Sequence, residues 1–179
     1  MIKHATAGAF VFCRVAAGGW RLGLIEHPRL GRWMVPGGHV EHDECQAQAA
    51  VREVEEESGL TGVRFLEVPT PPLPGGFPRT HVRVPLPWWI IEQRVPADNH
   101  LAEPHVHVDH QYLAVVDDSE PGRAGEHPFA WFTADEVSEL AMFEDSQLLA
   151  LMLFSCIGDL ANGQQDALEV LRPFAAAKH

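Results

Sequence analysis

Apolar and polar positions alternate along much of the chain with the spacing of β-strands. Residues 8–15 and 20–26 are rich in apolar side chains and flank a glycine-containing turn, which predicts a hairpin near the N-terminus. Comparable patterns predict further strands at 63–68, 88–95, 105–116 and 129–132. The pattern therefore predicts enough strands to build a sheet.

Residues 44–58 instead show the spacing of an amphipathic helix. Four apolar residues at i, i+3, i+4 and i+7 form one stripe: Ala47, Ala50, Val51 and Val54. Asp43 and Gln46 predict a capping box at the start of this helix, and Gly59 predicts its end. Two further helices are expected near 134–140 and from about 145 to 161.

Strands interspersed with helices predict an α+β fold, a mixed sheet with helices on both faces. A length of 179 residues is near that of one domain, and neither an internal repeat nor a clear linker divides it. We therefore expect a single domain over 1–179, with a C-terminal helical extension from about 145.

Prolines concentrate between residues 69 and 87, where seven occur in nineteen positions. Proline fixes the backbone and removes an amide donor, so this segment is expected to be neither a helix nor a central strand. We interpret it as a long surface loop that borders the substrate pocket.

The charge balance excludes some partners. Thirteen Lys and Arg residues face 25 Asp and Glu residues, which gives a formal net charge of −12. A surface of that sign repels duplex DNA and anionic membranes. The three cysteines form no CxxC pair, and the apolar run near the N-terminus is short, so a reduced, cytoplasmic protein is expected.

Three glutamates of the predicted helix at 44–58 share one narrow face. Glu56 and Glu57 follow Glu53 by one turn, and like charges at that spacing cost a helix a few tenths of a kcal/mol each, roughly. A hard divalent cation such as Mg²⁺ would explain the cluster. A solvated acidic face is the alternative.

A longer pattern surrounds these glutamates. Residues 38–60 read GHVEHDECQAQAAVREVEEESGL, that is Gly, five residues, Glu, seven residues, Arg-Glu, an aliphatic residue, one residue, Glu-Glu, one residue, Gly and an aliphatic residue. All nine specified positions match the Nudix box, and the sequence resembles the Nudix hydrolase family. Trp33, Pro36 and Gly37 extend the likeness upstream, and residues 129–140 extend it downstream.

The resemblance implies an α/β/α sandwich and a hydrolase that uses Mg²⁺, with Mn²⁺ as the alternative ion. The residues that match the family's metal-binding positions are Glu53, Glu56, Glu57, Gly37 and Glu44. Arg52 matches the arginine that orients a box glutamate, and its i+4 spacing to Glu56 suits that role. The general base is left open among Glu56, Glu120 and Glu126.

Other residues are candidates for substrate contact. His105, His107 and Asp109 lie at i, i+2 and i+4 of a predicted strand and so share a face. They are expected to contact a substrate phosphate or to hold a second metal ion, unless they are simply a polar strand face. Arg29 and Arg32 precede the box and are candidates for phosphate contact in an otherwise acidic protein.

The substrate class stays broad at this level. No substrate mark of a subfamily is met after the box, so a nucleoside triphosphate or related small nucleotide diphosphate is expected as the common family case. The alternatives are an ADP-ribose or nucleotide-sugar pyrophosphatase and a non-hydrolytic nucleotide-binding regulator. An apolar stripe in the last helix predicts either core packing or the seam of a homodimer: Leu148, Leu149, Met152, Leu153 and Cys156.

Overall fold

A computed structural model describes residues 1–16 and 18–163 of the chain. Its eight strands are β1 (Lys3–Arg14), β2 (Trp20–His27), β3 (Arg32–Met34), β4 (Gly37–His39), β5 (Arg64–Phe65), β6 (Trp89–Val95), β7 (His105–Val116) and β8 (Phe129–Phe132). The helices are α1 (Gln46–Ser58), α2 (Ala134–Glu139) and α3 (Glu144–Ala161). None of the helices in the described ranges is long and apolar enough to cross a membrane.

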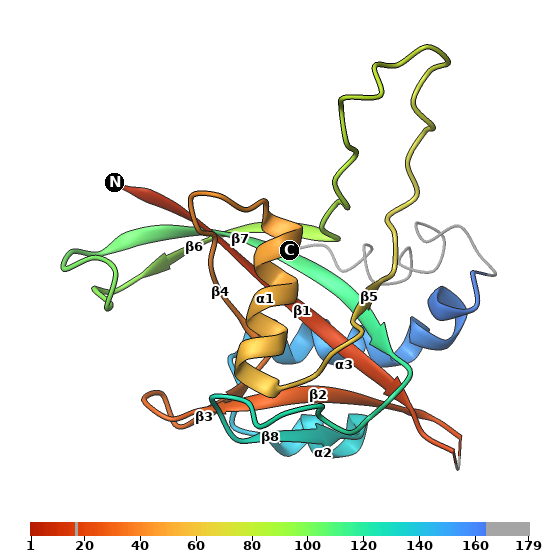
Figure 1. Ribbon diagram of the computed structural model, residues 1–179. Helices are drawn as coiled ribbons and strands as arrows, with labels where there is room; N and C mark the ends of the chain where they lie inside the picture. The colour runs from red at the N-terminus through yellow and green to blue at the C-terminus, as the bar shows by residue number, and fades with distance from the viewer. Residues whose placement is uncertain (17, 164–179) are drawn as a thin grey trace, which may run out of the picture.

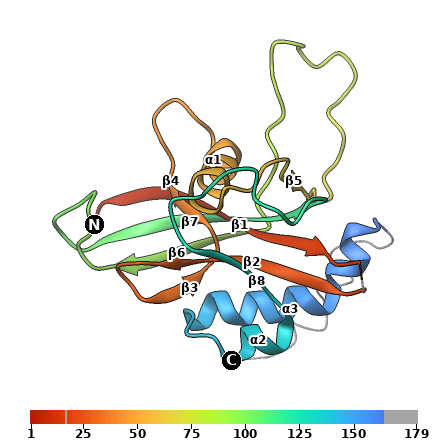
Figure 2. The same ribbon diagram turned by 60° about the horizontal axis from the view of Figure 1, so that its bottom comes forward.

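All strands join one mixed sheet, and helices cover both of its faces. α1 lies on one face, while α2 and α3 lie on the other (Figures 1 and 2). The strand path is β3-β2-β1-β7-β5, with β8 on β2 and β6 on β7. Among the strand pairs of the described residues, the central pair of β1 and β7 is parallel and the others are antiparallel. The predicted α+β class, a mixed sheet between helices, is confirmed.

Alternating side chains of the central strands feed two separate cores. Ala7, Ala9 and Val11 of β1 pack beneath α1 with Val54. Phe10 and Phe12, which face the other way, pack against α3 and β7. This division follows from the two-residue period of a strand, and it fixes which face each residue of β1 and β7 occupies.

β1 changes partner along its length, and this change places the box. Its C-terminal half pairs with β2, from Val11 to Arg14. Its N-terminal half pairs with β4, from Thr6 to Gly8. The chain crosses from β3 to β4 at Pro36, whose carbonyl accepts a hydrogen bond from the Ala9 N–H at 3.1 Å. Sequence patterning missed both β3 and β4, because three-residue strands carry too little periodicity.

The box helix starts later than its sequence predicts. α1 begins at Gln46 with Cys45 as the N-cap, and Gln48 Oε1 accepts the Cys45 N–H at 2.9 Å. The predicted capping box of Asp43 and Gln46 is therefore wrong. The cap is Cys45 and its partner is Gln48, each two positions further along the chain. The predicted end is confirmed, since Gly59 adopts the left-handed conformation with φ of 76°.

The apolar stripe of α3 contributes mainly to the core. Leu153 and Cys156 are buried against the sheet, and Leu149 and Met152 pack partly against the same cluster. Leu148 is 62% exposed and lies outside it. Core packing accounts for most of the stripe, so the structure gives a dimer seam only one exposed residue of that set.

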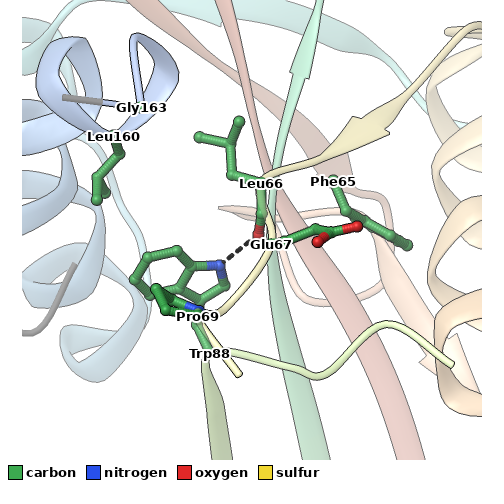
Figure 3. Close-up of a pocket in the computed structure, with 7 residues that line it drawn as sticks. All are labelled: Phe65, Leu66, Glu67, Pro69, Trp88, Leu160 and Gly163. Atoms are coloured by element: carbon green, nitrogen blue, oxygen red, sulfur yellow. Dashed lines mark hydrogen bonds between the residues drawn. The ribbon is translucent and has the colours of Figure 1, made fainter. Parts of the chain in front are cut away.

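The proline-rich segment carries neither helix nor strand, as predicted, and it projects from the body of the protein (Figure 1). Residues 71–86 are all exposed. At its base, Pro69 and Trp88 line a hollow of about 310 Å³ with Leu66 and Leu160. The Trp88 indole N–H donates to the Leu66 carbonyl at 2.8 Å across this hollow (Figure 3). No residue of the box lines it, so this hollow is distinct from the glutamate cluster.

Candidate active site

α1 lies against β4, and two glycines permit that close approach. The Gly37 N–H donates to Glu57 Oε2 at 2.9 Å. A Cβ on Gly37 would overlap the backbone of β1, and a Cβ on Gly38 would overlap the Glu53 carboxylate. The glycine pair therefore lets the carboxylates of Glu53 and Glu57 lie directly against the strand backbone.

Arg52 holds the other side of these carboxylates. Its Nη1 donates to Glu53 Oε1 at 2.8 Å and to Glu56 Oε2 at 3.0 Å, the latter across the i,i+4 spacing. Its Nε and Nη2 donate to the two oxygens of Glu44 at 3.1 and 2.7 Å. Nη2 also donates to the His39 carbonyl of β4 at 3.0 Å. One planar guanidinium thus fixes three glutamates and the adjacent strand.

The glutamates carry more negative charge than Arg52 balances. Burial raises the pKa of Glu57 to about 7 and outweighs the hydrogen bond from Gly37, with the charges of Glu53 and Glu126 adding to the effect. Burial also raises the pKa of Glu53, although Arg52 opposes that shift. The crowded, oxygen-only set fits a hard cation such as Mg²⁺, which would relieve the repulsion.

The loop between β7 and β8 docks on the end of α1. The Glu126 N–H donates to the Glu56 carbonyl at 2.8 Å, and the His127 N–H donates to the Glu57 carbonyl at 3.1 Å. His127 Nε2 also lies 3.3 Å from Glu57 Oε1. Glu120 is exposed and its N–H bonds within its own loop. The structure therefore brings Glu126 to the glutamate cluster and leaves Glu120 outside these contacts.

A second polar cluster lies where β4, β7 and the β6–β7 loop meet. His39, Asp98, His105 and His107 each offer one ligand atom, and these atoms all lie within 4.8 Å of one another. His105 Nε2 lies 3.0 Å from His107 Nε2, and Asp98 Oδ2 lies 3.3 and 3.5 Å from those two atoms. Buried His39 Nε2 has no hydrogen-bond partner among the described residues.

The environment of this cluster lowers the pKa of two of its imidazoles and of its carboxyl group. Burial, together with the nearby His100 and His107 rings, lowers the pKa of His39 to about 4. Burial also lowers the pKa of His107. Burial alone would raise the pKa of Asp98. The hydrogen bonds from the backbone N–H groups of Leu101 and His100 outweigh burial and lower this pKa to about 2.

The strand residues proposed for substrate contact divide into two groups. His105 is fully buried, so it offers a substrate no surface in this structure. His107 belongs to the histidine cluster with it. Asp109 lies apart: its carboxylate accepts from Thr6 Oγ1 at 2.9 Å and from the Gln111 amide. The three residues share a face as predicted, but they do not share one set of contacts.

The two loop arginines also separate. Arg32 Nη1 donates to the Met142 carbonyl at 2.7 Å, and its guanidinium lies 5.0 Å from the centre of the Phe143 ring. Arg32 therefore ties β3 to the α2–α3 connection instead of contacting the box. Arg29 is exposed and donates to Asn99 in the β6–β7 loop. Only Arg29 remains in an open loop.

Sequence reasoning missed three residues in these clusters. His39 occupies an unspecified position of the box, so no motif marks it. Asp98 lies in an irregular loop, and His127 follows a loop without regular spacing. The spacing of His105 and His107, two residues apart on one strand, was a usable signal for a histidine cluster. Which residues join that pair depends on strand register.

Comparison with known proteins identifies the family of the chain. The model of the NUDIX domain matches residues 4–152. No curated protein matches the sequence. A Nudix-family hydrolase from Clostridium perfringens superposes with a TM-score of 0.63 at 19% identity, over 88% of this chain and 99% of that one.

Two further solved structures share the fold. The binary complex of a Caenorhabditis elegans Ap4A hydrolase has a TM-score of 0.56 at 17% identity, covering 89% of this chain and 98% of that one. The NUDIX domain of Shewanella oneidensis NrtR, complexed with ADP ribose, has a TM-score of 0.50 at 18% identity, covering 92% and 89%. Because the NUDIX domain model matches most of the chain and the box is complete, the chain belongs to the Nudix family of hydrolases.

Proposed function

We propose that this protein is a metal-dependent hydrolase that cleaves the diphosphate linkage of a small nucleotide, a nucleoside diphosphate joined to another group. The observation that carries the proposal is the arrangement around Arg52. The Arg52 guanidinium donates hydrogen bonds to Glu44, Glu53 and Glu56, and the Gly37 N–H donates to Glu57. Such a buried concentration of carboxylates is costly unless it serves a cation and an anionic substrate.

Each residue receives a role from its position. Glu53, Glu56 and Glu57 would hold Mg²⁺, or Mn²⁺ in its place, with the Gly37 carbonyl and Glu44 in support. When bound, the ion neutralises phosphate oxygens and lowers the pKa of a coordinated water. Arg52 keeps the carboxylates oriented without contacting the reacting atoms.

The general base is proposed among residues near that cluster. The Glu56 side chain is 42% exposed and is the most open of the box carboxylates around Arg52, so it is placed to take a proton from an attacking water. Glu126 is the second candidate, because its backbone is bonded to the end of α1. Glu120 is the weakest, since it makes no such contact.

The substrate class rests on the family and on open polar positions. Arg29 is an exposed cation in an open loop and could contact a phosphate, and Asp109 is a half-buried carboxylate on the sheet face. An ADP-ribose or nucleotide-sugar substrate is a second candidate, favoured by the ADP ribose in one structural neighbour. The complete glutamate set argues against a regulator that only binds nucleotide. The three free cysteines suit a reducing compartment such as the cytoplasm.

A substrate panel tests the proposal. Purified protein is incubated with nucleoside triphosphates, diadenosine polyphosphates, ADP-ribose and nucleotide sugars, each with Mg²⁺, Mn²⁺ or excess chelator. We expect at least one compound to yield the two products of diphosphate cleavage, only when a divalent ion is present. Binding of a nucleotide without any product from the whole panel would instead support the regulator.

A further inference from the structure

The strand register brings three histidines onto the sheet face opposite α1. Thr6 of β1 pairs with His39 on one side and with Asp109 on the other, so these residues share a face. His105 and His107 of β7 lie on that same face by the two-residue period. Phe10, four residues after Thr6, packs against α3. The histidine cluster therefore occupies the α3 side of the sheet, while the box glutamates belong to α1.

The fourth member comes from the loop between β6 and β7, and that loop holds it in a fixed orientation. Asp98 Oδ1 accepts the N–H groups of His100 and Leu101 at 2.8 and 2.9 Å. Its other oxygen, Oδ2, is directed at His105 and His107. One carboxylate oxygen thus shapes the loop, and the second is left for the imidazoles. Metal-binding carboxylates are commonly oriented by outer hydrogen bonds of this kind.

Hydrogen bonding also leaves lone pairs facing one another at the centre. His105 Nδ1 lies 3.0 Å from the Glu103 carbonyl, which can only accept, so Nδ1 carries the proton of the neutral ring. His105 Nε2 then presents a lone pair to Asp98 Oδ2, an acceptor facing an acceptor at 3.3 Å. A cation between these atoms would turn that repulsion into coordination. Two metal-free alternatives exist: a neutral His107 protonated at Nε2 that donates to His105 Nε2 or Asp98 Oδ2, and a buried imidazolium paired with Asp98.

The spacing of the ligand atoms suits one class of ion. A tetrahedral Zn²⁺ with bonds of about 2.0–2.1 Å separates its ligand atoms by about 3.3–3.4 Å. The three measured separations among His105, His107 and Asp98 are 3.0, 3.3 and 3.5 Å. His39 offers the fourth ligand atom, a ring nitrogen within 4.8 Å of the other three, and its buried Nε2 has no hydrogen-bond partner in the described ranges. Three imidazoles and one carboxylate favour Zn²⁺ over Mg²⁺, which prefers oxygen ligands.

We propose that His39, Asp98, His105 and His107 form a four-coordinate Zn²⁺ site, separate from the Mg²⁺ site of the box. With four protein ligands the coordination shell is full, which is typical of structural zinc. The ion joins the β6–β7 loop to β4 and β7. β4 also carries the backbone groups bonded to Glu57 and Arg52, so the zinc would fix the strand on which the box rests.

Cobalt titration tests the proposal, because tetrahedral Co²⁺ absorbs strongly in the visible range and octahedral Co²⁺ only weakly. Metal-stripped full-length protein is titrated with Co²⁺ and then with Zn²⁺. We expect one equivalent of tetrahedral Co²⁺ that Zn²⁺ displaces. Asp98→Asn and His107→Gln should each weaken binding by at least about 100-fold, since even an outer partner of a metal ligand is worth 10–100-fold. Zn²⁺ should raise the melting temperature of the unmodified protein but not of Asp98→Asn.

Matched variants separate this site from the surface and from the box. His42→Gln and Asp117→Asn change exposed side chains, 94% and 96% accessible, and should keep full Co²⁺ affinity. Glu57→Gln should keep the tetrahedral spectrum even though it removes hydrolysis. The proposal is overturned if no tetrahedral spectrum forms, if Asp98→Asn and His107→Gln bind normally, or if Glu57→Gln abolishes the spectrum. Circular dichroism of each variant confirms that it is folded.

Discussion

Replacing Arg52 by Met should destabilise the protein far more than replacing an exposed arginine. The Arg52 side chain is 24% exposed, and its partners Glu44 and Glu53 are only 12% and 15% exposed. Methionine preserves much of the side-chain volume but leaves those carboxylates without a counter-charge. The substitution therefore isolates the electrostatic role of the guanidinium from its packing.

The magnitude follows from the burial of the partners. Removing one member of a buried ion pair costs about 3–5 kcal/mol, because the remaining charge stays desolvated. We expect about 3 kcal/mol, the lower end, since Glu56 is 42% exposed and regains water. For a chain of this length, that corresponds to a fall in melting temperature of about 6–12 °C. Lysine at this position should be intermediate, because an ammonium lacks the planar set of donors.

Urea unfolding in the presence of a chelator measures the effect on the metal-free protein. The control is Arg64→Met: Arg64 is 60% exposed and lies 3.6 Å from Asp117, and such surface pairs contribute about 0–1 kcal/mol. Combining Arg52→Met with Glu44→Gln should cost less than the sum of the two single changes, because they share one interaction. If Arg52→Met unfolds within about 0.5 kcal/mol of the unmodified protein, the guanidinium does not organise the cluster as described.

Three further predictions use other parts of the structure. Gly38→Ala should reduce turnover more than stability, because its Cβ would displace the Glu53 carboxylate. The control is Gly75→Ala, whose Cβ meets no atom within 4 Å and should change neither turnover nor stability. Activity assays and melting curves compare the two variants. Iodoacetamide at pH 8 should modify half-buried Cys45 well before buried Cys13 and Cys156, because burial raises the pKa of the Cys13 and Cys156 thiols, that of Cys156 to about 11. Mass spectrometry follows the order of modification, and equal rates for the three thiols in the folded protein would contradict this prediction. Deleting Thr70 to Arg79 should alter KM or substrate preference more than melting temperature, since residues 71–86 are all exposed; unchanged kinetics on every accepted substrate would make the loop a neutral insertion.

The sequence predicts the longer elements well because each carries several periods of its pattern. The stripe from Ala47 to Val54 identifies α1, and the spacing of Arg52 and Glu56 predicts their contact. β3 and β4 are too short to show a pattern, and their pairing depends on distant residues of β1 and β2. Local composition also misplaced the cap of α1, since Asp43 is the better cap by residue type but Cys45 occupies the position.

The histidine cluster shows the limit of sequence reasoning most clearly. The spacing of His105 and His107 places both on one strand face, but it also suggested Asp109 as their partner. The structure instead directs Asp109 to Thr6 and Gln111, and supplies Asp98 from the adjoining loop. A loop residue has no periodicity to report its direction, so only the three-dimensional arrangement reveals that partner.

The hydrolysis rate of Glu57→Gln at saturating Mg²⁺ tests the central proposal most directly. Glutamine retains the shape and an acceptor for the Gly37 N–H, but it removes the buried charge. Glu55→Gln is the control, because it makes the same charge change on the same helix outside the Arg52 and Gly37 contacts. We expect kcat/KM to fall at least about 100-fold for Glu57→Gln, since loss of a metal ligand should exceed the 10–100-fold effect of an outer partner, with little change for Glu55→Gln. Near-normal turnover of folded Glu57→Gln would show that the glutamates of α1 do not hold the catalytic metal.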